Sequence, residues 1–254
     1  MRRKEWTGLE GRRLEEKRKE ERELGERRRN EWTGGERRRM EKRRGGGGEG
    51  EEGRRLGESP PHRKRRKRVQ QYEVEVTLDP DTAQPKLILS DDGKQVHDGG
   101  VVKELPDNPK RFTQYLYILT RQSFSSGRFY FEVQVKDKTA WWLGVARESI
   151  RRKDLITFTP ENGGWTLYFL KDKLVFFGNP VVNLLVRAKL QKVGVFVDYD
   201  AGLVSFYDVE ARAHIYSATG CTFSEPLYPI LSPCSHDGGR NSTPLIISPV
   251  NQTD

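Results

Sequence analysis

Short runs of alternating apolar and polar residues, each ended by a turn signal, dominate the chain from residue 72 onward. The runs at 73–78, 129–136 and 193–197 place an apolar side chain at every second position. Because successive side chains of a strand point to opposite faces, such runs predict half-buried strands. No segment of this region keeps a helical period, so it is predicted to be an all-β, antiparallel sandwich or barrel.

Further short apolar runs in the same region predict the remaining strands. They lie at 141–146, 165–170, 174–177, 203–207, 215–217, 227–231 and 245–247. Clusters of Gly, Pro, Asn and Asp separate the runs, as at 91–93, 106–109, 161–164, 198–202 and 237–239. Residues 69–254 suffice for one such domain, which would bury on the order of 70% of its unfolded surface.

The first 68 residues have a different composition. Of these residues, 53 are Gly, Glu, Lys or Arg, and they hold 26 Lys+Arg against 15 Asp+Glu, a net of +11. Residues 69–254 hold 20 Lys+Arg against 22 Asp+Glu, a net of −2, so the chain's charge of +9 comes entirely from the first segment. Its few apolar residues cannot offset chain entropy, so residues 1–68 are predicted to be a disordered, basic, low-complexity Arg/Glu/Gly-rich tail.

The tail ends in a continuous basic run, formed by Arg63, Lys64, Arg65, Arg66, Lys67 and Arg68. Such a run fits a nuclear-import signal or a contact with nucleic acid or an anionic surface. It also fits a solvated linker, which is the more frequent case. Nucleic-acid contact is therefore an alternative that rests on the tail alone.

Several classes of protein are excluded by what the sequence lacks. No stretch approaches 18 consecutive apolar residues, and no apolar run in the first 30 residues marks a secretory signal. Two cysteines, Cys221 and Cys234, are too few for a disulfide scaffold or a cysteine-based zinc module. Both lie in apolar stretches and are expected to be buried free thiols in strands. The simplest expectation is a cytoplasmic protein, or a nuclear one if the basic run is an import signal.

Three segments, in order and spacing, resemble the signature motifs of the PRY–SPRY domain family. They are Leu78-Asp79-Pro80-Asp81-Thr82-Ala83, Phe131-Glu132-Val133 and Val197-Asp198-Tyr199-Asp200. The stretches 141–149, 164–167 and 226–229 are also similar to that family, and the resemblance covers residues 72–250. The nearest resemblance is to the C-terminal domains of fish tripartite-motif ubiquitin ligases. Two positions depart from the pattern, since Phe131 stands where Trp is usual and Trp142 where Asp is usual.

The resemblance implies a bent two-sheet β-sandwich that recognises proteins through variable loops at one end. The PRY part is expected at about 72–120 and the SPRY part at about 125–250. Loops held by a rigid sandwich lose little entropy on binding, which suits such a role. A ubiquitination or innate-immune context follows from the same resemblance.

Matching the family's variable loops gives six candidate partner-binding residues: Tyr115, Trp142, Tyr168, Leu170, Ser235 and His236. Exposed aromatic residues beside polar loops are typical protein anchors. Trp141 and Trp165 are expected in the core. Since neighbours on a strand face opposite ways, Trp142 is expected to point outward at a loop, and Tyr168 could lie either way. The antibody-binding relatives carry different residues at these positions, so immunoglobulin binding is not expected.

Nothing in the sequence predicts an enzyme, a cofactor or a metal site. The four histidines lie in no metal-ligand or nucleophile motif. Asp198 and Asp200 form a carboxylate pair, but at a strand–turn junction such residues more often bond backbone N–H groups. The zinc RING of the ligase relatives needs about eight Cys and His ligands, which this chain does not supply. The chain is therefore expected to be a monomeric recognition module, or a fragment of a longer ligase.

Overall fold

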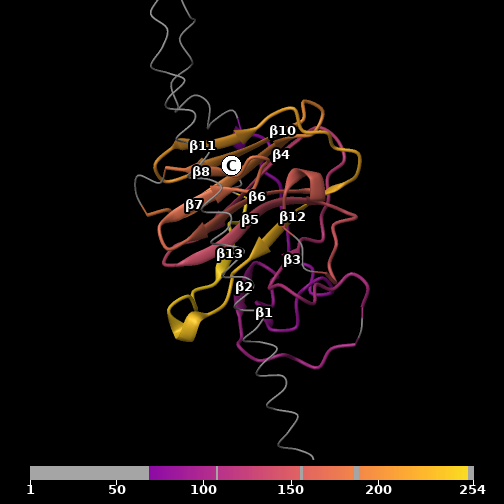
Figure 1. Ribbon diagram of the computed structural model, residues 1–254, viewed down its shortest axis with the longest axis vertical. Helices are drawn as coiled ribbons and strands as arrows, with labels where there is room; N and C mark the ends of the chain where they lie inside the picture. The colour runs from indigo at the N-terminus through magenta and orange to yellow at the C-terminus, as the bar shows by residue number, and fades with distance from the viewer. Residues whose placement is uncertain (1–68, 107, 155–156, 186–188, 251–254) are drawn as a thin grey trace, which may run out of the picture. The chain divides into compact units, whose positions relative to one another are not determined.

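The computed structural model describes residues 69–106, 108–154, 157–185 and 189–250, and these residues form two antiparallel β-sheets with very little helix (Figure 1). The predicted all-β sandwich is confirmed. The tail at 1–68, with its basic run Arg63–Arg68, lies outside the described residues. No helix in the described part of the chain is long and apolar enough to cross a bilayer.

The first sheet has seven strands in the order β1-β2-β13-β4-β9-β10-β11. Its strands are β1 (Leu87–Leu89), β2 (Gln95–Asp98), β13 (Leu245–Ile247), β4 (Arg128–Gln134), β9 (Lys192–Asp198), β10 (Leu203–Asp208) and β11 (Ala213–Ala218). The last strand of the chain, β13, therefore joins the early hairpin β1–β2 to the rest of the sheet. In Figure 1 this yellow strand lies beside the early strands β1 and β2.

The second sheet has six strands in the order β3-β12-β5-β6-β7-β8. Its strands are β3 (Ile118–Leu119), β12 (Leu227–Ser232), β5 (Ala140–Arg147), β6 (Gly164–Leu170), β7 (Lys173–Phe176) and β8 (Val182–Leu184). Two single-turn 3₁₀ helices interrupt the loops, η1 (Pro160–Asn162) and η2 (Asp237–Gly239). Strands β5 and β6 pair over their whole length, with Trp142 opposite Tyr168.

The main core lies between the two sheets and is built from the apolar half of each alternating run. Trp141, Leu143 and Val145 of β5 and Leu167 of β6 are at most 1% exposed, and all belong to one cluster with the inward residues of β4 and β9. Trp165 is also in this cluster, so the prediction that Trp141 and Trp165 are core residues is confirmed.

The outer face of β4 is also buried, which the alternation does not predict. Tyr130 and Glu132 point away from the core, yet they are 0% and 4% exposed. Residues 69–74 cover them: Val69 packs on Tyr130, the backbone N–H of Val74 donates to the Tyr130 carbonyl, and Gln70 donates to Glu132 Oε1. The chain thus enters the domain along this face.

The predicted strand at 73–78 is the one clear error in the strand assignment. Val76 and Leu78 are buried as the alternation requires, but only isolated bridges form, from Glu73 to Tyr130 and from Leu78 to Thr120. The segment is extended without a partner strand along its length. Strands β1, β2, β3 and β8 lie outside the predicted runs, because two to four residues are too few for a visible period.

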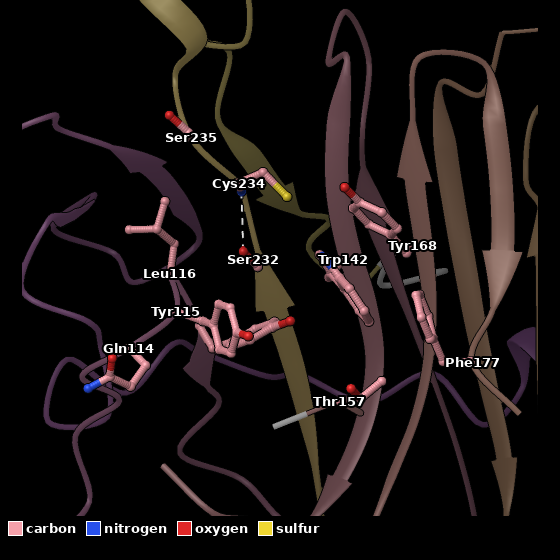
Figure 2. A pocket seen from close by; sticks show the side chains of 11 residues that line it. Gln114, Tyr115, Leu116, Trp142, Thr157, Tyr168, Phe177, Ser232, Cys234 and Ser235 are labelled. Carbon is pink, nitrogen blue, oxygen red and sulfur yellow. Dashed lines mark hydrogen bonds between the residues drawn. The ribbon is translucent and has the colours of Figure 1, made fainter. Parts of the chain in front are cut away.

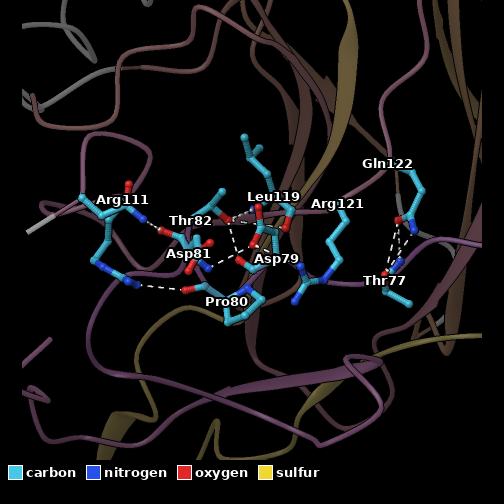
Figure 3. Close-up of polar contacts among 10 residues, drawn as sticks. Thr77, Asp79, Pro80, Asp81, Thr82, Arg111, Leu119, Arg121 and Gln122 are labelled. Carbon is cyan, nitrogen blue, oxygen red and sulfur yellow. Dashed lines mark hydrogen bonds and ion pairs between the residues drawn. The ribbon is translucent and has the colours of Figure 1, made fainter. Parts of the chain in front are cut away.

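The turn after Leu78 attaches the first part of the domain to the second sheet (Figure 3). The backbone N–H of Asp79 donates to the Leu119 carbonyl, and the Thr82 hydroxyl accepts from the Leu119 N–H at 3.0 Å. Buried Arg111 donates from Nη1 to the carbonyls of Pro80 and Ala83, at 2.9 and 2.7 Å. Arg111 therefore anchors the loop at 108–116, which leads to the candidate site.

Candidate functional site

An open groove of about 420 Å³ lies on the outer face of the six-stranded sheet (Figure 2). Strands β5, β6 and β12 supply its floor, and the segments at 114–117 and 232–235 supply its sides. The residues lining it are Gln114, Tyr115, Leu116, Tyr117, Trp142, Thr157, Tyr168, Phe177, Ser232, Cys234 and Ser235. We call it the Trp142 groove.

Trp142 is the centre of the aromatic floor. Its ring stacks on Tyr168 at 4.6 Å and on Phe177 at 4.7 Å between centroids, and Tyr117 meets it edge-on at 6.0 Å. Tyr168 and Phe177 are only 6.1 Å apart, so they cannot lie on opposite faces of the indole. They back one face, and Figure 2 shows the indole between these rings and the open groove.

One side wall, Cys234–Ser235, is fixed by a buried asparagine. Asn241 is 2% exposed, and its Oδ1 accepts from the N–H groups of Thr139 and Ala140. Its Nδ2 donates to the carbonyls of Ala140, Pro233 and Ser235. The wall is thereby tied to the start of β5, two residues before Trp142. Since this side chain is buried and fully bonded, the Asn241-Ser242-Thr243 sequence offers no accessible glycosylation acceptor.

A buried lysine holds the other end of the same loop. Lys138 is 2% exposed, and its Nζ donates to the carbonyls of Asn241 and Thr243 at 3.3 and 2.8 Å. Burial lowers the pKa of Lys138 to about 8. One further bond holds the loop to β2, since Asp98 accepts from the backbone N–H of His236.

The groove lining carries no charge at neutral pH. None of its residues is Asp, Glu, Lys, Arg or His. Burial raises the pKa of the Cys234 thiol to about 11 and raises the pKa of Tyr168 above its ordinary value. These groups are therefore neutral, and the thiol is a poor nucleophile. The groove can bind an apolar side chain and offer hydroxyl and amide hydrogen bonds, but it has no acid or base for catalysis.

Four of the six residues predicted to bind a partner meet in this groove: Tyr115, Trp142, Tyr168 and Ser235. The other two, Leu170 and His236, do not line it. Leu170 ends β6 with 38% of its surface exposed. The His236 ring lies beside Gly100, where a Cβ atom would be 3.1 Å from Nε2.

Trp142 points away from Trp141 as expected, and it lies in strand β5 within the predicted run at 141–146. One detail of the prediction, the placement of the two cysteines, is wrong. Cys221 and Cys234 are free thiols, yet they lie outside the strands and are only partly buried. Cys234 has a positive φ of 57° at the turn that follows β12.

Sequence reasoning missed the residues that complete the groove. Tyr117, Phe177 and Cys234 lie in or beside apolar runs, so their pattern is that of core residues. The register could have found Ser232, because it pairs directly with Trp142 across the sheet. Phe177 follows the end of β7, and nothing in its local pattern indicates that its ring turns outward.

The carboxylate pair Asp198 and Asp200 acts as a turn cap in the structure. Asp198 accepts from the Ala201 N–H at 3.0 Å and from Arg128 Nε at 2.6 Å, while Asp200 accepts from the Gly127 N–H at 3.0 Å. Within the described ranges no three His, Cys, Asp or Glu side chains are placed to hold a metal ion.

Comparison with protein families gives two adjacent matches. The SPRY-associated domain matches residues 76–124, and the SPRY domain matches residues 128–245. The groove uses both matched segments, since Tyr115 and Tyr117 come from the first and Trp142 and Tyr168 from the second.

Curated relatives match the same part of the chain. Human pyrin is 48% identical over 183 residues, which cover 72% of this chain and 23% of pyrin. Human zinc finger protein RFP is 44% identical over 188 residues, covering 73% of this chain and 36% of RFP. The mouse E3 ubiquitin-protein ligase TRIM21 is 38% identical over 187 residues, covering 73% and 40%. The chain thus spans well under half the length of these relatives.

Solved structures share the fold. The TRIM65 PSpry domain superposes with a TM-score of 0.62 at 22% identity, covering 76% of this chain and 99% of that one. Stonustoxin superposes with a TM-score of 0.60 at 25% identity, covering 70% of this chain and 29% of that one.

Proposed function

The chain belongs to the PRY–SPRY domain family, and on that premise we propose that it recognises a protein partner through the Trp142 groove. The geometry of the groove carries this proposal. An aromatic floor lies open on the outer face of a sheet, while the opposite face of the same strands is core. Aromatic side chains that are partly exposed in a pocket are the usual anchors of protein interfaces.

The groove is also held in shape before any partner arrives, which favours binding. Tyr168 and Phe177 support the indole from behind, Asn241 fixes the wall at Ser235, and Arg111 anchors the loop that carries Tyr115. A rigid site loses less side-chain and loop entropy on association, so more of the contact energy is available for affinity.

We further propose a ubiquitination or innate-immune setting, inside the cell, in which this domain selects the partner. The name of TRIM21, an E3 ubiquitin-protein ligase, supports the ubiquitination setting, together with the 38% identity of its matched segment. Ligase activity would then reside in residues that this chain does not contain, since it has two cysteines and four histidines in all. Nucleic-acid contact through Arg63–Arg68 remains the alternative, and it rests on residues outside the described part.

The proposal is tested by removing the floor of the groove in the full chain. Trp142→Ala and Tyr168→Ala, singly and together, are compared with the original chain in quantitative affinity capture from a cell extract. The matched control is Leu185→Ala, which truncates an aliphatic side chain that is 81% exposed beyond the edge strand β8. Urea midpoints of all variants check that the fold is intact.

We expect the groove variants to lose a defined set of captured proteins that the Leu185→Ala chain retains. A single buried aromatic anchor typically contributes 2 kcal/mol or more, or roughly a thirtyfold loss in affinity. Unchanged capture by a folded double variant would refute the groove as the recognition site.

A further inference from the structure

Two loops beside the Trp142 groove carry an excess of positive charge. The segment 108–116 contains Lys110 and Arg111 and no acidic residue. The segment 148–154 contains three basic residues against Glu148 and Asp154. Together the two segments carry a net charge of +3. We call them the basic corner.

Hydrogen bonds join the two segments of the basic corner to each other, next to the groove. The backbone N–H of Thr113 donates to the Arg152 carbonyl at 3.0 Å, and the Thr113 hydroxyl donates to the Lys153 carbonyl at 3.3 Å. Thr113 is followed directly by Gln114 and Tyr115, which line the groove. Because consecutive Cα atoms are 3.8 Å apart, Arg151 and Arg152 lie within a few residue lengths of the groove wall.

Two cations of the corner are available to a partner, whereas the others serve the fold. Arg111 is buried and bonded to two carbonyls. Arg152 lies over the Phe112 ring and donates to the carbonyls of Lys110 and Glu148. Lys110 and Arg151 are exposed, and the side chain of neither has a hydrogen-bond or ion-pair partner among the described residues.

The charge of the corner differs from that of the rest of the domain. Residues 69–254 carry a net charge of −2, so the domain without this corner is at −5. The positive potential is therefore local and lies beside an uncharged aromatic groove. Complementary charge favours a partner with acidic groups next to an apolar anchor.

We propose that the partner segment is an acidic peptide that places one large apolar or aromatic side chain in the Trp142 groove and its carboxylates on Lys110 and Arg151. This inference rests on the proposed function and adds the chemistry of the ligand. The open indole face receives the anchor, and the two free cations set the orientation of the segment.

A peptide fits this surface better than a nucleic acid does. A polyanionic strand extends past the corner and meets a domain of net charge −5, whereas a short acidic segment meets only the positive corner. Nucleic-acid surfaces also gather many phosphate contacts, and here only Lys110 and Arg151 are unengaged.

The test pans a phage-displayed library of random nonamers against the full chain. The same library is panned against Lys110→Glu/Arg151→Glu and against Trp142→Ala. All three proteins keep residues 1–68, so acidic peptides that bind only the basic tail are enriched on each of them and can be subtracted. Lys189→Glu serves as the matched control, because Lys189 is an exposed lysine near Asp137, outside the corner.

We expect the original chain and Lys189→Glu to enrich nonamers with one large apolar residue flanked by Asp or Glu. Lys110→Glu/Arg151→Glu replaces two attractions by two repulsions, so it should bind these peptides roughly tenfold more weakly. Trp142→Ala should not enrich them.

Three outcomes overturn the proposal. Enrichment of apolar peptides with neutral or basic flanks, lost in Trp142→Ala, would refute the acidic chemistry and leave the groove as the site. Enrichment that Trp142→Ala retains in full would refute the groove and with it the proposed function. The third outcome is that no peptide is enriched and that the original chain binds a single-stranded RNA 12-mer. If both the groove variant and the corner variant abolish this RNA binding, the surface is a nucleic-acid site.

Discussion

Raising the pH from 7 to 9 should stabilise this domain, because a lysine is buried in it. Lys138 has a pKa of about 8 in the folded chain, against an ordinary value of 10.5. The cause is desolvation, since the side chain is buried beneath the groove wall and only 2% exposed. Unfolding therefore takes up a proton between about pH 8 and 10.5, and the free energy of unfolding rises with pH in that window.

The size of the effect follows from the two pKa values. At pH 7 the protonated lysine costs the folded state roughly 3 kcal/mol, and at pH 9 roughly 2 kcal/mol, so roughly 1 kcal/mol is gained between them. Cys234 acts in the opposite direction, because its pKa is raised from 9.0 to about 11. Its stabilising effect is present below pH 9 and is lost toward pH 11, so by pH 9 it has removed only a minor part of that gain.

Urea unfolding followed by tryptophan fluorescence measures both contributions in the full chain. Relative to Lys138→Met, which cannot titrate at this position, the original chain should gain roughly 1 kcal/mol of unfolding free energy from pH 7 to 9. Cys234→Ser should gain more than the original chain over the same range, because it lacks the opposing thiol. Other titrating groups, Cys221 among them, cancel in these differences. If the unfolding free energy changes with pH in the same way for the original chain and for Lys138→Met, the desolvation of Lys138 is refuted.

Three further substitutions probe the supports of the fold and the groove. Asn241→Ala should lower the unfolding free energy by more than about 3 kcal/mol, because several buried partners lose their hydrogen bonds; a urea midpoint near the original would contradict this. Gly144→Ala should be similarly damaging, since its Cβ would lie 2.1 Å from the Trp165 carbonyl oxygen; thermal unfolding measures it. A chain beginning at Val76 should be at least about 2 kcal/mol less stable than one beginning at Val69, because Tyr130 loses its cover; equal melting temperatures would show that this cover is dispensable.

The fold could be predicted largely because each long strand is amphipathic or wholly apolar. The alternation at 193–197 is visible at a period of two and the run at 141–146 is continuously apolar, and both are strands. The extended segment at 73–78 shows where this signal fails. The alternation in this segment correctly predicts burial, because Val76 and Leu78 lie in the core. Burial does not require that another strand pairs with the segment along its length.

The site could be predicted only in part, because its residues come from six separate segments of the chain. Tyr115, Trp142, Tyr168 and Ser235 were accessible through family resemblance. Tyr117 and Phe177 were not, since an aromatic residue next to an apolar run has the same local pattern whether it turns inward or outward. Only the register of β5 with β6 and β12 decides which side chains share a face.

Strands β5 and β6 carry core residues on one face and groove residues on the other, so the groove can change its residues while the core keeps its own. Trp141 and Leu143 lie in the core, and Trp142 between them lies in the groove, so on the proposed function a substitution at 142 should alter recognition without opening the sandwich. The same holds for Tyr168, between Leu167 and Phe169. Lys138, by contrast, supports the groove wall from within at a cost in stability. A different partner should therefore be accommodated by substitutions at Trp142, Tyr168, Lys110 and Arg151. Substitutions of Lys138, which lies beneath the groove wall, should change binding and stability together.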